Sequence, residues 1–419
     1  MNTEVLKKYE KAMDRLYVVC LFLILIYELL GSTPILVMIL SGISNGVAEE
    51  DSALAVLVYQ GIVNLRFLII LPAVYNIVVK AKGVTERVVL GGLLVLGWIY
   101  SFYMREVNDT YIFRDAMMIA ATYGRDYKKI LKWSIYLAGG FMCLTVLLNL
   151  VGILPEDNLV RDGKVRHSFG TLGPTNLAGH VGFVILSFIF LKEGRIKWPA
   201  YVIIAALSIL NMVFVDGRTS QISVILATGG CLVLLAAEQL KLKPPEKLMK
   251  VFSRCMLLSF VIMSALTLVL VLTYNPDPGV FYNRIHFLES FRGRLENANR
   301  VLSVTGVSLL GRYYQNYWIP GQGFIETGNY EFLDSSYARL FIMYGVAGFA
   351  VIISLLTFLQ YRLMKAGKVF CMFVMAVCSI HFVMEHHILE PAYNIFLILP
   401  FAAFKDSSTP LRSARNDKC

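Results

Sequence analysis

Arginine side chains are concentrated in two polar segments that separate apolar stretches of the sequence. The first segment, 153–176, reads ILPEDNLVRDGKVRHSFGTLGPTN, and the second covers about residues 275–335. Their arginines are Arg161, Arg166, Arg284, Arg292, Arg294, Arg300 and Arg312. A guanidinium group is always charged and can bind two phosphate oxygens at once, so these segments could hold a phosphate or diphosphate group. Contact with lipid headgroups, or pairing with Glu289, Glu296 and Asp334, is the alternative.

Three further arginines lie beside or within apolar runs. Arg218, in the sequence VDGRTSQIS, stands between two long apolar runs, where it could reach a ligand or simply extend to the membrane interface. Arg66 and Arg339 have apolar neighbours, and a charge is costly there, so we expect each to face a partner or a cavity inside the protein. Glu28, in the first apolar run, is a candidate partner for Arg66.

Two histidines are candidates for acid–base chemistry. His167 directly follows Arg166 in the first arginine-rich segment. His180 lies four residues after Asn176, so these two side chains share one face of a helix. His180 could therefore line a site or belong to a packed polar cluster.

The motif Glu385-His386-His387, with Glu390, has the residue types of a metal site. Adjacent residues of a helix point to different faces, so we expect no metal there and expect Glu385 to face a cavity. The sequence has no GxxxxGK[ST] loop, no GxGxxG motif after a strand and no DxD pair. An enzyme with this sequence would therefore need an activated donor that is already in the membrane, such as a sugar on a polyprenyl diphosphate.

The composition predicts an all-α, polytopic membrane protein that positions these side chains. Of 419 residues, 57% are hydrophobic and only 16% are charged, and the mean hydropathy is +0.63. Apolar windows predict about twelve transmembrane helices. They are 16–40, 54–79, 88–104, 110–123, 133–153, 176–191, 198–216, 219–239, 255–274, 336–360, 369–385 and 391–404. The segment 110–123 is short and contains Arg114 and Asp115, so a half-span or an interfacial helix is the alternative there.

The distribution of charge predicts the orientation. Most of the 39 Lys and Arg fall in the segments that would be cytoplasmic if the N-terminus were inside, which explains the net charge of +10 without nucleic acid. We therefore expect one transmembrane domain, 1–404, with both termini cytoplasmic and a cytoplasmic tail at 405–419. The two arginine-rich segments would then lie outside, and part of the second is expected to be a helix across the outer face.

The order of these motifs resembles the Wzy-type oligosaccharide repeat-unit polymerases of bacterial capsule and exopolysaccharide clusters. The resemblance covers the second half of the chain, whereas the part before Ile153 matches only in hydropathy. Its motifs are RHSFGTLGPTNLAGH (166–180), GRTS (217–220), FRGRLENANRVLSVTGVSLLG (291–311), LDSSYARLFIMYGVAGF (333–349) and EHHILEPAYNIFLIL (385–399). This sequence has Gly173-Pro174-Thr175-Asn176 where the family often has His-Pro-Asn, and Ser335 where it often has Asn.

The resemblance implies a metal-independent glycosyltransferase of the bacterial cytoplasmic membrane that needs no cofactor. It would move a growing glycan from undecaprenyl diphosphate onto a fresh lipid-linked unit, alongside the flippase and chain-length regulator of the same pathway. Arg166, Arg218 and Arg294 would hold the diphosphate, and His167 or Asp334 would orient or deprotonate the acceptor hydroxyl. Further candidates for contact with the diphosphate or glycan are Arg292, Asn176, His180, Tyr337, Arg339 and Glu385.

Two alternatives remain open from the sequence. A ligase of the O-antigen type would pass the finished glycan to a different acceptor. A flippase of lipid-linked sugars would gather its cations in a central cavity that is reached from both sides, whereas most of the outer arginines here fall in loops.

Overall fold

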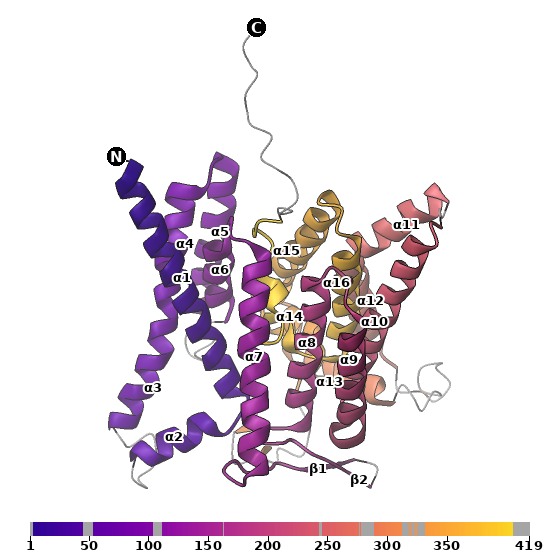
Figure 1. The fold of residues 1–419 in the computed structure, drawn as a ribbon. Helices are drawn as coiled ribbons and strands as arrows, with labels where there is room; N and C mark the ends of the chain where they lie inside the picture. Colours follow the sequence, from indigo (N-terminus) through magenta and orange to yellow (C-terminus); the bar gives the residue numbers. More distant parts are fainter. Residues whose placement is uncertain are drawn as a thin grey trace.

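The computed structural model describes residues 3–44, 53–103, 111–161, 163–242, 245–275, 277, 289–311, 318–319, 323–324 and 332–404. These residues form a helical bundle with two short β-hairpins (Figure 1). The first part contains α1 (Thr3–Gly31), α2 (Ile35–Ser44), α3 (Ala53–Leu65), η1 (Arg66–Ile69), α4 (Ile70–Tyr75), η2 (Asn76–Lys80), α5 (Val84–Tyr103), α6 (Tyr111–Thr122) and α7 (Tyr127–Leu150). The predicted all-α class is confirmed.

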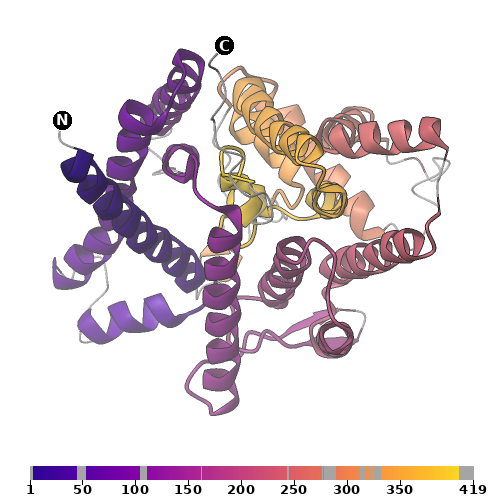
Figure 2. The same ribbon diagram turned by 45° about the horizontal axis from the view of Figure 1, so that its top comes forward.

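The second part of the chain begins with a hairpin and returns to helices. Its elements are β1 (Leu159–Arg161), β2 (Lys164–Arg166), α8 (Pro174–Leu191), α9 (Trp198–Leu210), η4 (Asn211–Val215), α10 (Arg218–Gln239), α11 (Glu246–Leu257), α12 (Ser259–Leu272), α13 (Glu289–Thr305), β3 (Trp318–Ile319), β4 (Gly323–Phe324), α14 (Ser336–Met343), α15 (Gly345–Lys365), α16 (Val369–Met384), η7 (His387–Leu389) and η8 (Ile395–Ile398). Helix α7 stands between the N-terminal helices α1–α6 and the later helices (Figures 1 and 2).

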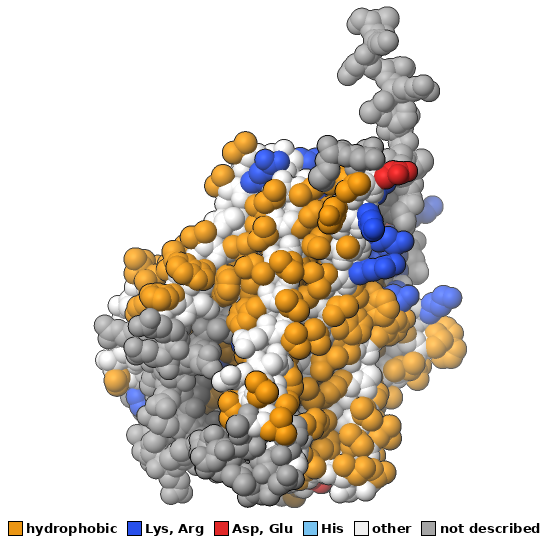
Figure 3. Space-filling view, turned by 90° about the vertical axis from the view of Figure 1, so that its left-hand side faces the viewer, with side chains coloured by type: hydrophobic (Ala, Val, Ile, Leu, Met, Phe, Trp, Pro, Cys, Tyr) orange, Lys and Arg blue, Asp and Glu red, His pale blue; other side chains and the backbone are white. Residues whose placement is uncertain are grey.

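The chain is a multi-pass membrane protein. Among the described residues, seven helices are long and apolar enough to cross a membrane, and the number rises to nine if two bent pairs each count as one span. The seven are Val56–Lys80, Val84–Tyr103, Tyr127–Leu150, Pro174–Leu191, Trp198–Val215, Arg218–Gln239 and Gly345–Lys365. Many large apolar side chains are exposed on their outer faces, and Figure 3 shows this surface with Lys and Arg gathered toward its upper end. Such a surface is suited to lipid.

Several predicted spans are bent, divided or shortened in the structure. The predicted span 16–40 bends by 90° between α1 and α2, and 336–360 is divided into α14 and α15 at Tyr344. The predicted span 255–274 is α12, which bends by 62° from α11. Helix α6, in the predicted span 110–123, has only 12 residues, and most of them are buried in the protein.

The prediction of a helix over 391–404 is wrong. This segment consists of turns and the short 3-10 helix η8, and its side chains are almost all buried. It nevertheless runs from the end of α16 to the far end of the bundle, where the Ala403 N–H donates to the Arg125 carbonyl at 2.7 Å. Irregular backbone is tolerated at membrane depth only where protein surrounds it. Residues 391–404 are therefore enclosed by protein along this path.

One end of the bundle is held by ion pairs between segments that are far apart in sequence. Lys80 lies 3.2 Å from both Glu10 and Asp14, and Arg125 lies 2.8 Å from Asp14. Glu193 lies 3.0 Å from Lys128 and 2.9 Å from Lys368, and it accepts a hydrogen bond from the Tyr127 hydroxyl. These contacts bring together the turns that contain Lys80, Arg125, Lys128 and Lys368 beside the N-terminus. We call this end of the bundle the basic end. The β1–β2 hairpin and α13 lie at the other end (Figure 1).

Replacing Glu193 should reduce stability in a pH-dependent manner. Partial burial opposes ionisation of this carboxyl, but hydrogen bonds from Lys368, Lys128 and Tyr127 lower its pKa from 4.5 to about 2. The stabilisation is therefore complete above pH 4.5 and disappears as the pH falls through 2. We expect Glu193→Gln to lose on the order of 1 kcal/mol at pH 7. Thermal unfolding in detergent at pH 7 and pH 3 measures this, and an equal loss at both values would contradict it.

Candidate functional site

Helix α13 positions Arg294 at the end opposite the basic end. Apolar residues at helical spacing, Leu295, Ala298, Val301 and Leu302, pack against Leu333, Ala338 and Ile342 and against Val271 at the end of α12. The prediction of a helix in the second arginine-rich segment is thus confirmed for residues 289–305. Arg294 lies one helical turn before Ala298, at the border of this apolar face.

Arg294 contacts two carboxylates and the end of α16. Its Nε donates to the Met384 carbonyl at 2.7 Å. The same guanidinium lies 3.7 Å from an Asp334 oxygen and 3.7 Å from a Glu385 oxygen. Its side chain is 13% exposed. Arg294 is therefore fixed in place by backbone and carboxylate contacts, while one edge remains open to solvent.

The β1–β2 hairpin places Arg166 against the corner between α9 and α10. The Arg166 Nε donates to the Val215 carbonyl at 3.1 Å, and the His167 N–H donates to the Phe214 carbonyl at 2.8 Å. Lys164 adds a third bond, from Nζ to the Met212 carbonyl at 3.1 Å. These bonds hold the hairpin on the helix corner, so that Arg166 is only 3% exposed.

Arg166 is buried among like and unlike charges. Burial, followed by the positive charges of Arg161 and Arg218, lowers the pKa of Arg166 to about 10. The carboxylates of Asp216 and Glu385 act in the opposite direction. Its buried Nη2 has no hydrogen-bond partner among the residues that the structure describes. A buried donor without a partner is costly. Arg166 therefore has one buried donor that no described backbone or side-chain group satisfies.

Asp216 links two further arginines to this corner. It lies 3.6 Å from Arg161 and 3.2 Å from Arg218. Its backbone is left-handed, with φ of 51°, and at the next residue, Gly217, a Cβ atom would lie 2.2 Å from Ala178. The chain therefore turns sharply from η4 into α10 and brings Arg218 to the first turn of that helix.

The predicted arginines thus meet around acidic groups. Arg166 and Arg294 both lie within electrostatic range of Glu385, and Arg166 is influenced by Arg218 as well. We call Arg166, Arg218 and Arg294 the arginine triad. Asp216, Asp334 and Glu385 supply the negative charge next to the triad.

The motif from Glu385 to Glu390 is not α-helical and contains only the short 3-10 helix η7. Helix α16 ends at Met384, and the backbone of Glu385 is extended, with φ of −129°. The His386 and His387 rings consequently lie 4.1 Å apart, so the expectation that these neighbours would point in different directions is wrong. Donor atoms of Glu385, His386 and His387 all lie within 4.8 Å of one another, which a metal ion could use. His387 Nδ1 lies 2.9 Å from Glu390, an arrangement that orients the ring.

A stack of rings fixes this motif against α8. The Tyr393 ring lies between His387, at 3.8 Å, and His180, at 3.6 Å between centroids. At Gly179, a Cβ atom would approach the Tyr393 ring to 3.0 Å, so glycine allows this close contact. His180 also lies 3.1 Å from the Ser32 hydroxyl. Of the two alternatives predicted for His180, lining a site or packing in a polar cluster, the structure shows the packed cluster.

The other predicted residues occupy separate places. His167 lies 2.7 Å from Glu156 and lines a groove of about 450 Å³ with Phe169 and Phe214. The Tyr337 hydroxyl is buried and donates to the Ser379 carbonyl at 2.8 Å. Three further candidates are half-buried: Asn176 in the first turn of α8, Arg292 on α13, and Arg339, whose guanidinium lies 5.6 Å from the Phe332 ring. Arg284 and Arg312 lie outside the described residues.

Sequence reasoning missed a fully buried charge cluster. Arg114 forms an ion pair with Glu28, lies 2.7 Å from an Asp115 oxygen and donates to the Leu389 carbonyl at 2.8 Å. The Glu28 carboxylate also accepts the Ala392 N–H at 2.7 Å. The proposed pairing of Glu28 with Arg66 is therefore wrong, and Arg66 instead lies over the Tyr27 ring at 5.0 Å. The presence of Arg114 and Asp115 in an apolar segment was the available signal.

Comparison with protein-family models, curated proteins and solved structures gives no match.

Proposed function

We propose that this chain is a Wzy-type polysaccharide polymerase that acts on polyprenyl-diphosphate-linked glycans. The main support is the arginine triad, in which a buried Arg166 nitrogen has no hydrogen-bond partner among the described residues. Three guanidinium groups can neutralise the charge of a diphosphate and bind several of its oxygens. We expect the undecaprenyl chain to lie in the membrane, with the diphosphate at the triad.

The proposed reaction transfers the glycan to a sugar hydroxyl. The acceptor oxygen bonds to the anomeric carbon of the donor while the bond from that carbon to the diphosphate oxygen breaks. The diphosphate leaves with the bonding electrons, and the triad stabilises its added charge. Asp334 is the better-placed candidate to take the hydroxyl proton, since it lies 3.7 Å from Arg294, whereas His167 lines a separate groove with Glu156.

The proposed topology has both termini in the cytoplasm and the arginine triad at the outer face. Twelve crossings would include the two bent helix pairs, the divided span of α14 and α15, and the shorter helices α6 and α16. The buried passage over 391–404 would be the twelfth. The concentration of Lys and Arg at the basic end supports this orientation. The chain would then meet its lipid-linked donor and acceptor at the outer leaflet of the bacterial cytoplasmic membrane.

Incubation of purified protein with one lipid-linked repeat unit tests the proposed activity. A polymerase produces a ladder of lipid-linked glycans on a gel, whereas a flippase leaves the single unit unchanged. A ligase consumes the unit only when a second, different acceptor is added. Absence of a ladder from folded protein with an authentic repeat unit would overturn the polymerase assignment.

We expect Arg218→Ala to lower the rate of polymer formation about a hundredfold, because each lost contact to the leaving diphosphate costs on the order of 3 kcal/mol. Arg195→Ala is the matched control, since Arg195 is similarly exposed and is paired with Glu238 at the basic end. The ladder assay measures both variants. Equal ladders from Arg218→Ala and the wild type would exclude Arg218 from the site.

Chelation should leave the activity unchanged. If the arginine triad supplies the positive charge, EDTA has no ion to remove, and the ladder should form at its normal rate. Loss of the ladder in EDTA and its recovery with added Zn²⁺ or Mg²⁺ would instead assign a metal to Glu385, His386 and His387. His387→Ala would then abolish the recovery.

A further inference from the structure

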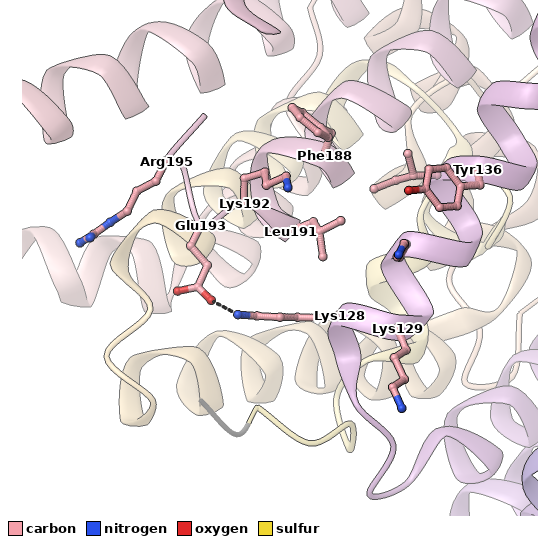
Figure 4. Close-up of a pocket in the computed structure, with 10 residues that line it drawn as sticks. Lys128, Lys129, Tyr136, Phe188, Leu191, Lys192, Glu193 and Arg195 are labelled. Carbon is pink, nitrogen blue, oxygen red and sulfur yellow. Dashed lines mark ion pairs between the residues drawn. The ribbon is translucent and has the colours of Figure 1, made fainter. Parts of the chain in front are cut away.

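A cationic groove lies at the basic end, between the start of α7 and the end of α8 (Figure 4). Its volume is about 740 Å³. The lining side chains are Lys128, Lys129, Lys132, Ile135, Tyr136, Phe188, Leu191, Lys192, Glu193 and Arg195. Five cations and one carboxylate therefore surround a space that is large enough for more than one phosphate group.

Not all of these cations are available to a ligand. Figure 4 shows Lys128 reaching Glu193, at 3.0 Å, and Arg195 extending away from the groove, where it lies 2.7 Å from Glu238. Lys129, Lys132 and Lys192 are exposed and form no ion pair among the described residues. These three lysines give the groove its unbalanced positive charge.

Aromatic and apolar side chains occupy the adjoining wall. The Lys132 nitrogen lies 5.6 Å from the Tyr136 ring, and the Lys192 nitrogen lies 5.9 Å from the Phe188 ring. Tyr136 is 61% exposed on the outer surface of α7, in the setting of an interfacial aromatic residue. The groove thus has positive charge at one edge and an apolar surface that continues down two membrane-spanning helices.

We propose that this groove binds an anionic phospholipid with two phosphate groups. The phosphates would lie between Lys129, Lys132 and Lys192, and the acyl chains would lie against Tyr136, Phe188 and Leu191 on α7 and α8. A soluble anion would use the lysines but would gain nothing from the apolar wall. A diphosphatidyl lipid satisfies both parts of the groove, and basic pockets between membrane helices bind such headgroups. This site is distinct from the arginine triad, which lies at the opposite end.

Native mass spectrometry of the full chain, with lipid supplied in detergent, tests the proposal. We expect wild-type protein to retain diphosphatidylglycerol in preference to phosphatidylcholine. The triple variant Lys129→Gln, Lys132→Gln, Lys192→Gln should bind diphosphatidylglycerol roughly a hundredfold more weakly, since each lysine near a lipid phosphate contributes to the affinity. The single variants Lys132→Gln and Lys192→Gln should each lose roughly fivefold, which keeps the proposal testable if the triple variant does not fold.

A control with the same change in charge separates the groove from general attraction. Lys7, Lys8 and Lys11 are exposed on α1 at the basic end, outside the groove, so their triple replacement by Gln should leave lipid retention unchanged. Inorganic pyrophosphate should displace little lipid. Equal losses in the two triple variants would overturn the proposal, as would equal retention of the two lipids. Full displacement by pyrophosphate would assign the groove to a free diphosphate instead.

Discussion

Arg294→Ala should reduce polymer formation by at least a hundredfold while leaving the amount of folded protein unchanged. The guanidinium contacts both Asp334 and Glu385, so its loss removes positive charge from the leaving diphosphate and leaves two carboxylates to repel that group. The first effect alone is worth on the order of 3 kcal/mol in barrier height. Arg294→Lys should recover only part of the rate, because an ammonium group cannot hold two oxygens in the guanidinium geometry.

Arg300→Ala provides the matched control for this prediction. Arg300 lies on the same helix, is exposed and contacts Asn297 at 2.7 Å, one turn earlier. The ladder assay on purified protein, with thermal unfolding of each variant, distinguishes catalysis from stability. If Arg294→Ala forms normal ladders, or if Arg300→Ala fails to the same degree, the arginine triad is not the diphosphate site.

Arg114→Ala should be the most destabilising substitution among the charged residues. It would leave Glu28 and Asp115 inside the protein without their partner and would remove the donor to the Leu389 carbonyl. Breaking a buried ion pair by removing one partner costs about 3–5 kcal/mol. We expect a large fall in the thermal midpoint and little protein in the membrane fraction.

A surface pair on α11 serves as the comparison. Lys250 lies 2.6 Å from Glu246, and both side chains are largely exposed, so Lys250→Ala should change stability by less than about 1 kcal/mol. Differential scanning fluorimetry in detergent measures both variants. If Arg114→Ala unfolds at the wild-type temperature, the cluster of Arg114, Glu28 and Asp115 does not hold α1, α6 and the C-terminal segment together.

The sequence predicted most of the helices because lipid exposure requires long apolar runs. Val84–Tyr103 and Arg218–Gln239, for example, lie close to the predicted spans. The prediction of a helix failed where the apolar segment is surrounded by protein and not by lipid. Residues 391–404 are as apolar as a span, but local turns and contacts with other segments satisfy their backbone, so hydropathy alone could not distinguish them from a helix.

Residue type and position drew attention to Arg166 and Arg294 in polar segments and to Arg218 between two apolar runs, and their common role stays a prediction. The proximity of Arg166 and Arg294 to Glu385 depends on contacts between distant segments, such as the bond from Arg166 to Val215, which no local pattern encodes. The pairing of Glu28 with Arg114 was missed for the same reason, since the two residues lie on different helices. The close approach of His386 and His387 was missed because the end of α16 at Met384 has no glycine or proline to mark it.

The enclosed passage over 391–404 has a consequence for biogenesis. Its hydrogen-bond partners include Glu28 and Arg125, which leave the ribosome hundreds of residues earlier. A segment without a regular helix has poor affinity for the hydrocarbon core by itself. It should therefore settle only after α1, α6 and α7 have assembled, so that the bundle is completed late in the folding of the chain.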